Sequence, residues 1–188
     1  ARLANILGGV IQGATGAVDG QTSTLFGTSN EIFVTNARPV LLCRARMPSV
    51  VTTSKFEIGF GDAAGQMVNV KATPTSTGTD YAVIIRDTND DTTISLIVDG
   101  TTPAVASVDF GAATATFTTN TFYTFMLALN EENAAYAWMD GVFAAAQRGN
   151  GPDDAITLAP TVTLVTRAAA NRTFDVDYIK VVCNRTVF

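Results

Sequence analysis

Apolar and polar residues alternate along much of this chain with a period of two. Between Leu41 and Met47 every second side chain is apolar or small, and Arg44 and Arg46 take the alternate positions. The stretch 55–60 follows the same rule, with its phenylalanine and isoleucine residues two positions apart. Because successive side chains of a strand point to opposite faces, this alternation predicts β-strands that bury one face.

Turn residues separate these stretches at intervals of roughly 8–12 residues, the spacing typical of an all-β domain. The segments predicted as strands are 32–34, 40–47, 55–60, 67–72, 81–86, 94–98, 122–129, 134–139, 142–146, 162–165 and 174–183. The polar turn 87–91 predicts a hairpin, and the segments from 122 to 146 predict a meander. In residues 174–183 the alternation predicts that Phe174, Val176, Tyr178 and Val182 lie on a common face of the strand.

These segments predict an all-β fold. Roughly eleven to thirteen short antiparallel strands need two packed sheets, and a jelly roll protects the edges of so many strands. No stretch has a convincing 3.6-residue period, so very little helix is expected. The sequence therefore predicts a two-sheet antiparallel β-sandwich with jelly-roll topology.

The N-terminal stretch differs from the rest because glycines interrupt a weakly apolar run at residues 8, 9, 13, 16 and 20. We expect residues 1–29 to form an arm or extended segment and residues 30–188 to form the sandwich domain. Two hypotheses remain for the first segment. It is either a strand behind a frayed end, or an arm that becomes ordered against a neighbouring subunit.

Composition excludes several functions. The 188 residues are enough for one domain with a large core, and the net charge is −5, from 12 Lys and Arg against 17 Asp and Glu. The few cations are scattered and form no basic stripe, so nucleic acid is not expected as a partner. Histidine is absent, which rules out every mechanism that needs an imidazole. No apolar run approaches the ~18 residues of a membrane span, and no membrane partner is expected.

Two regions together resemble the concanavalin A-like jelly roll shared by legume-type lectins, laminin G-like domains and family 16 glycanases. Residues 122–129 followed by 134–141 are similar to a hairpin of that fold, in which an aromatic strand is followed by a second strand ending in Asp-Gly. Residues 174–182, Phe-Asp-Val-Asp-Tyr-Ile-Lys-Val-Val, resemble its closing strand, and residues 56–62 suit an early one. The resemblance implies architecture more than function.

The two cysteines are Cys43 and Cys183, about 140 residues apart, so they form neither a CxxC motif nor a metal cluster. The resemblance implies that the first and last strands are neighbours, which would bring both within reach of a disulfide. The alternative is a pair of buried thiols.

The catalytic pattern of the family 16 glycanases, Glu-x-Asp-x-x-Glu, is missing. Glu57 is followed by Gly59 and Asp62 where that pattern needs Asp and Glu. Asp175 and Asp177 could still assemble with Glu57 into an unrelated acid pair, although buried acids more often pair with arginine. We therefore expect no catalytic residues, no cofactor and no enzymatic activity.

Metal and sugar sites are the remaining candidates for chemistry. The acidic turn 87–91 fails the EF-hand pattern, because Thr92 stands at its sixth position and Val98 at its twelfth, so no metal site is expected. Tyr136 and Trp138 fall on one strand face. They either fill the core, which is the more common role of such a pair, or form an exposed platform for sugar binding.

A stiff acidic β-sandwich without catalytic groups suits a part of an assembly. We therefore predict a non-catalytic virion protein, a capsid decoration or cement protein of a bacteriophage, which acts on the virion surface as a homo-oligomer bound to capsid or other virion proteins. The alternative is a lectin-like, carbohydrate-binding module that recognises a glycan through Tyr136 and Trp138.

Overall fold

The computed structural model describes most of the chain. The described residues are 9–25, 33–34, 37–48, 50–62, 79–90, 92–100, 106–111, 117–130, 132–153 and 156–184. The strand expected at 67–72 lies outside them. Within the described residues there are thirteen strands and no α-helix, and no helix is long and apolar enough to cross a membrane.

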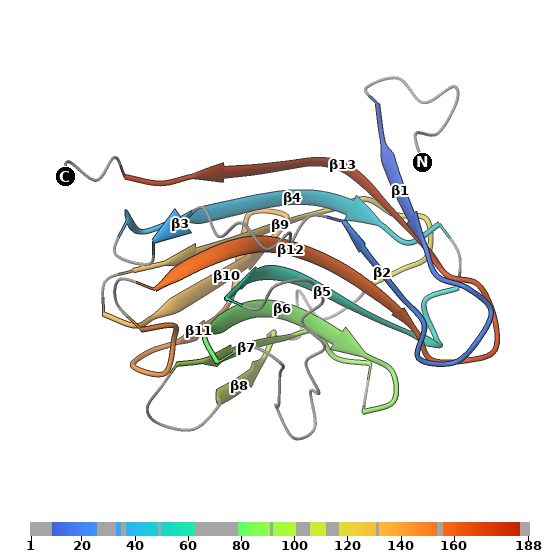
Figure 1. The fold of residues 1–188 in the computed structure, drawn as a ribbon, viewed down its shortest axis with the longest axis horizontal. Helices are drawn as coiled ribbons and strands as arrows, with labels where there is room; N and C mark the ends of the chain where they lie inside the picture. Colours follow the sequence, from blue (N-terminus) through green and yellow to red (C-terminus); the bar gives the residue numbers. More distant parts are fainter. Residues whose placement is uncertain are drawn as a thin grey trace.

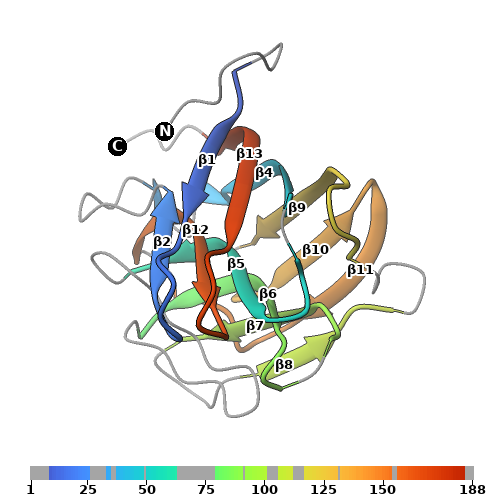
Figure 2. The same cartoon turned by 90° about the vertical axis from the view of Figure 1, so that its right-hand side faces the viewer.

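The strands form two antiparallel sheets packed face to face (Figures 1 and 2). The six-stranded sheet has the order β1-β13-β4-β9-β10-β11, and the seven-stranded sheet has the order β2-β12-β5-β6-β7-β8 with β3 also paired to β12. In chain order the strands are β1 (Ile11–Ala14), β2 (Thr22–Leu25), β3 (Phe33–Val34), β4 (Val40–Arg46), β5 (Ser54–Gly61), β6 (Tyr81–Asp87), β7 (Ser95–Asp99), β8 (Ala106–Asp109), β9 (Tyr123–Leu129), β10 (Ala135–Met139), β11 (Val142–Gln147), β12 (Thr157–Thr166) and β13 (Thr173–Val182). The predicted two-sheet sandwich is confirmed.

The core lies between the two sheets and is built from the faces that the alternation predicted. Leu41, Cys43, Ala45 and Met47 are fully buried in it, as are Phe56, Ile58 and Phe60. Phe56 is at the centre of an aromatic cluster, with ring centroids 4.9 Å from Phe117, 5.8 Å from Phe125 and 6.0 Å from Phe174. The hairpin β6–β7 and the meander β9–β10–β11 are paired as predicted.

Strand β13 departs from the predicted pattern. Phe174 and Val176 are buried, but Tyr178 and Val182 are 42% and 48% exposed. The pairing with β4 shifts by one residue between Val176 and Tyr178, which is a β-bulge. The bulge turns Tyr178 to the outer face of the six-stranded sheet, so the expected common face is wrong.

The described part of the N-terminal segment is paired within the sandwich. Strand β1 pairs with β13 in one sheet, and β2 pairs with β12 in the other, so this segment passes from one sheet to the other (Figure 2). Glycines permit the crossing. A Cβ on Gly13 would lie 2.9 Å from Ser23 Oγ, and Gly20 has a φ of +80°, which L side chains rarely adopt.

Of the two alternatives for Cys43 and Cys183, the disulfide is not formed and both cysteines are free, but only Cys43 is a buried thiol. Cys43 pairs in register with Ile179, four residues before Cys183. Four residues of strand separate backbone positions by about 13 Å, whereas the Cα atoms of a disulfide lie within about 7 Å. Cys43 also faces the core while Cys183 is exposed, and burial raises the pKa of the Cys43 thiol to about 12.

A thiol reagent should therefore distinguish the two cysteines. In the folded protein we expect rapid labelling of Cys183 alone, because the thiolate is the reactive form and Cys43 is both buried and protonated. Mass spectrometry should show one label on the native protein and two after unfolding in guanidinium chloride. Two labels at equal rates in the native protein would contradict the burial of Cys43.

Candidate functional site

Three aromatic side chains lie together on the outer face of the six-stranded sheet. Ala135, Ala137 and Met139 of β10 face the core, so Tyr136 and Trp138 point outward and are partly exposed. The ring centroids of Tyr136 and Trp138 are 6.3 Å apart, and Phe143 of β11 meets Trp138 edge-on at 5.7 Å. We call Tyr136, Trp138 and Phe143 the aromatic platform. The preferred expectation that Tyr136 and Trp138 fill the core is wrong, because the alternate residues of β10 take the core positions.

A β-bulge places Phe143 in this platform. Ala145 is buried, so regular alternation would also turn Phe143 to the core. Instead, Ala137 pairs with Ala145 and the next residue, Trp138, pairs with Phe143, leaving Ala144 as an extra residue on β11. As a result Phe143 is 54% exposed beside Trp138. Phe143 could not be predicted as part of the platform from the sequence, because no turn signal marks a bulge inside a run of alanines.

One cation accompanies the platform. The guanidinium of Arg148 lies 5.9 Å from the centroid of the Tyr136 ring, within range of a cation–π interaction. Arg148 is exposed, and it makes no ion pair with any of the described residues. An exposed aromatic surface with a cation beside it can stack against the apolar face of a ring and also pair with a negative charge.

The far side of the same face carries arginines that are already paired. Arg44 binds Asp177 at 2.5 Å, and Arg46 binds Asp175 at 2.9 Å. Both guanidinium groups also lie over the ring of Phe122, at 4.5 and 4.6 Å from its centroid. These aspartates therefore serve as partners of arginines, the role that sequence reasoning favoured for buried acids.

Glu57 is on the other sheet and is not brought together with those aspartates. It points away from the core on β5 and forms an ion pair with Lys55, two residues earlier on the same face, and both side chains are fully buried. Thr163 of β12 and Ile85 of β6 are its neighbours in register. The acid pair considered from the sequence, Asp175 or Asp177 with Glu57, is therefore not assembled.

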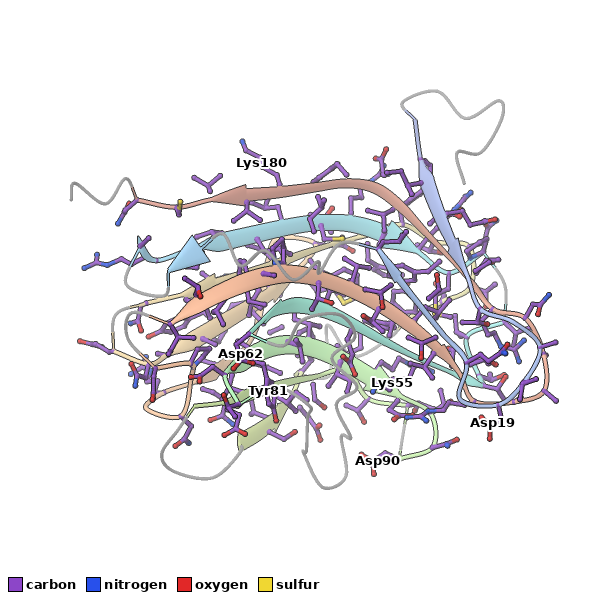
Figure 3. All side chains as sticks on the ribbon, in the orientation of Figure 1. Asp19, Lys55, Asp62, Tyr81, Asp90 and Lys180 are labelled. Atoms are coloured by element: carbon purple, nitrogen blue, oxygen red, sulfur yellow. The ribbon has the colours of Figure 1, made fainter. Side chains whose placement is uncertain are left out.

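A buried tyrosine lies near this ion pair. Of the described buried side chains, the Tyr81 hydroxyl is the one polar atom without a hydrogen-bond partner. Burial raises the pKa of Tyr81, and the negative charges of Asp99 and Glu57 raise it further. Figure 3 shows Tyr81 beside Asp62 at one end of the seven-stranded sheet and Lys55 farther along it. Such an orphaned hydroxyl is uncommon in native proteins and marks this face as unusual.

Carboxylates gather at the Tyr81 end of the sheet. Burial raises the pKa of Asp80, and repulsion from Asp153 and Asp62 adds to this, although a hydrogen bond from the Asp153 amide, 2.7 Å long, opposes it. Burial also raises the pKa of Asp99, with further contributions from Asp80 and Asp62. No group of three or more acidic or cysteine side chains in the described part of the chain has the geometry to hold a metal ion.

In the acidic turn 87–91, Asp87 is the partner of an arginine. The carboxylate of Asp87 forms an ion pair with Arg167, with a 2.9 Å bond from Nε to Oδ1. Asp91 lies outside the described residues.

Comparison with known proteins supports the fold and not a particular function. No family model matches the sequence, and no curated protein matches it. Among solved structures, an endo-β-1,4-glucuronan lyase from the fungus Trichoderma reesei superposes with a TM-score of 0.67 at 12% identity, covering 98% of this chain and 86% of the lyase. The carbohydrate recognition domain of Emp46p gives 0.62 at 11% identity, covering 94% and 89%. A family 16 endo-glucanase from Bacteroides ovatus gives 0.59 at 10% identity, covering 97% and 84%.

At 10–12% identity these similarities establish the fold alone. The chain has the concanavalin A-like jelly-roll fold of lectins and glucanases, as its motifs implied. The three solved structures also correct the prediction that the chain is not an enzyme, because two of them are enzymes that act on glycans. The missing Glu-x-Asp-x-x-Glu pattern excludes one mechanism on this fold and does not exclude catalysis.

Removing one member of the buried ion pair should destabilise the protein strongly. Glu57→Gln removes the carboxylate charge that pairs with the buried Lys55 ammonium, so we expect the free energy of unfolding to fall by about 3–5 kcal/mol. The double variant Lys55→Met with Glu57→Leu should recover most of that loss, because both charges of the pair are removed together. Guanidinium denaturation measures the free energy of unfolding of the single and the double variant, with the substitution of exposed Asp19, Asp19→Asn, as a control. A single variant as stable as the control would contradict the buried pair.

The raised pKa values of Asp80 and Asp99 predict a dependence of stability on pH. The folded protein holds these protons to a higher pH than the unfolded chain, whose reference value is 3.8. The free energy of unfolding should therefore decrease as the pH rises from about 3.8 through the folded-state pKa values. We expect Asp99→Asn to have a higher Tm than the parent at pH 7 and an equal Tm near pH 3.5. A gain in Tm of the same size at pH 7 and at pH 3.5 would show that the gain does not come from the ionisation of Asp99.

Proposed function

We propose that this protein binds a carbohydrate on the outer face of its six-stranded sheet. The observation that carries the proposal is the aromatic platform, in which Tyr136, Trp138 and Phe143 are in contact and reach the solvent together. The occurrence of the fold in the Emp46p carbohydrate recognition domain and in enzymes that act on glycans adds support.

The three rings of the platform are partly or fully exposed to solvent. A cluster of large apolar side chains at the surface leaves apolar area in contact with water, and such patches commonly mark interaction sites. Sugars have apolar C–H faces and polar edges, so a ring can stack on Trp138 while its hydroxyl groups stay in water. Stacking on a rigid aromatic side chain also orders few rotatable bonds.

The predicted roles in a virion receive no support from the comparisons. Capsid or other virion partners, a homo-oligomer and a place on the virion surface therefore stay predictions. Adhesion to a larger structure is common to both hypotheses, since a glycan-binding face would also attach the protein to a surface that displays many copies of the ligand.

A second candidate function is glycan cleavage at the seven-stranded sheet. The specific observation is the orphaned hydroxyl of Tyr81, which lies near enough to Glu57 and Asp99 for both charges to raise its pKa. A group of this kind is a candidate for proton transfer once a ligand uncovers it. Tyr81→Phe removes only the hydroxyl, so it separates this function from binding at the platform.

The binding proposal is tested by affinity electrophoresis and calorimetry on a panel of soluble polysaccharides. We expect Trp138→Ala to weaken binding by about tenfold or more, because one aromatic contact is worth roughly 1.5 kcal/mol. Phe143→Ala should weaken it less. Both side chains lie outside the core, so the Tm should change little.

Tyr178→Ala is the matched control, because it removes an exposed aromatic from the same sheet, on β13. Equal binding by Trp138→Ala and the parent, or no binding by the parent to any polysaccharide, would overturn the proposal. The same samples are assayed for new reducing or unsaturated ends. Cleavage that survives in Trp138→Ala but is lost in Tyr81→Phe would favour the second candidate.

A further inference from the structure

We propose that the ligand is an acidic polysaccharide, which lies across the strands of the six-stranded sheet with its negative groups at Arg148 and Lys180. This inference rests on the proposed function and names the class of glycan. It follows from the line of apolar side chains that continues from the platform and from two cations, Arg148 beside Tyr136 and Lys180 at the β13 end of the line.

The register defines a continuous line across five strands. Starting on β11, it contains Phe143, Trp138, Met126, Leu42 and Lys180, one residue from each of β11, β10, β9, β4 and β13. We call its first four residues the apolar track. A parallel line beside it contains Ala146, Tyr136, Ala128, Val40 and Val182. All these side chains are partly or fully exposed, so the track is open along its length.

The length of the track suits a polymer better than a single sugar. Neighbouring strands are about 4.8 Å apart, so the backbone positions of Phe143 and Lys180 are separated by about 19 Å over four strand spacings. This distance accommodates several sugar rings in an extended chain. Apolar contacts repeat at every strand, and each would add to the affinity of a longer oligosaccharide.

The charges on this face favour an anion. Arg148 stands over Tyr136 in the platform, and Lys180 closes the track at its other end. Neither makes an ion pair with a described residue, whereas Arg44 and Arg46 on the same face are neutralised by aspartates. In a chain with a net charge of −5, one cation beside Tyr136 and another at the β13 end of the apolar track are a local reversal of sign.

Acidic side chains frame the track without lying on it. Glu132 is in the β9–β10 turn and Asp140 is in the β10–β11 turn, at opposite ends of β10. The acidic polymer would therefore meet Lys180 at one end of the track and Arg148 beside Tyr136, with anions beyond the two sides of the track. This arrangement favours binding of an extended chain in one direction, across the strands.

The experiment compares polysaccharides that differ only in charge. Polygalacturonate is paired with its methyl ester, and dextran sulfate is paired with dextran, so carboxylate and sulfate are tested separately. We expect the parent to bind at least one acidic polymer more tightly than its neutral counterpart. Arg148→Gln and Lys180→Gln should each weaken that binding by about two- to fivefold, and the double variant by the product, while binding of the neutral polymer is unchanged.

Two controls test whether the effect is local. Arg148→Lys keeps the charge and should retain most of the affinity. Asn89→Asp changes the net charge by the same single unit as Lys180→Gln, but in the turn beside Asp90 at the opposite side of the molecule (Figure 3). Binding of the acidic polymer should also weaken in high salt, which screens these exposed charges.

The outcomes separate this inference from the proposed function. If Trp138→Ala abolishes binding but the Arg148 and Lys180 variants do not weaken it, the ligand is a neutral glycan and this inference is wrong. Equal weakening by Asn89→Asp would show a general effect of net charge and would also overturn it. Failure of the parent to bind any polymer would overturn the proposed function itself.

Discussion

A strand in a two-layer sandwich can bury only one of its two faces in the shared core, and the rest of this structure depends on that constraint. The core takes the apolar set from each strand, including Leu41 and Cys43 on β4 and Phe56 and Ile58 on β5. Every other side chain is directed to one of the two outer faces. Function in such a scaffold must therefore be sought in what the outward-facing residues form when the register places them side by side.

The two outer faces have different physical character. On the six-stranded sheet the outward residues include exposed aromatic and aliphatic side chains, with a few charges that are mostly paired. On the seven-stranded sheet the outward positions of β5 and β6 carry Lys55, Glu57 and Tyr81, and all three are fully buried. The side chains of the first face are in contact with solvent, whereas these three side chains of the second face are not.

Much of the fold could be predicted because its signals are local. Alternation identified the buried faces of β4 and β5, and turn residues located the hairpin β6–β7 and the meander β9–β11. The candidate site was predicted only in part. Tyr136 and Trp138 were recognised as a pair, but their direction depends on which neighbours the core can accommodate, and the alternate residues of β10 hold the core positions.

The rest could not be predicted because it depends on register or on distant parts of the chain. Phe143 and Tyr178 reach the surface through single-residue bulges, which alternation cannot reveal. Cys183 lies four residues after Ile179, the residue that pairs with Cys43, and this offset is set by strand pairing. The opposite charges of Lys55 and Glu57, two residues apart on a predicted strand, were a signal that could have suggested an ion pair.

The bulge at Ala144 has a consequence for how such a surface can change during evolution. Deletion of that single residue would make Phe143 and Ala145 adjacent, so regular alternation would still place Ala145 in the core and Phe143 in solvent. In this architecture, a bulge therefore lets a strand accept a single inserted residue while the surface aromatic and the two sheets keep their places.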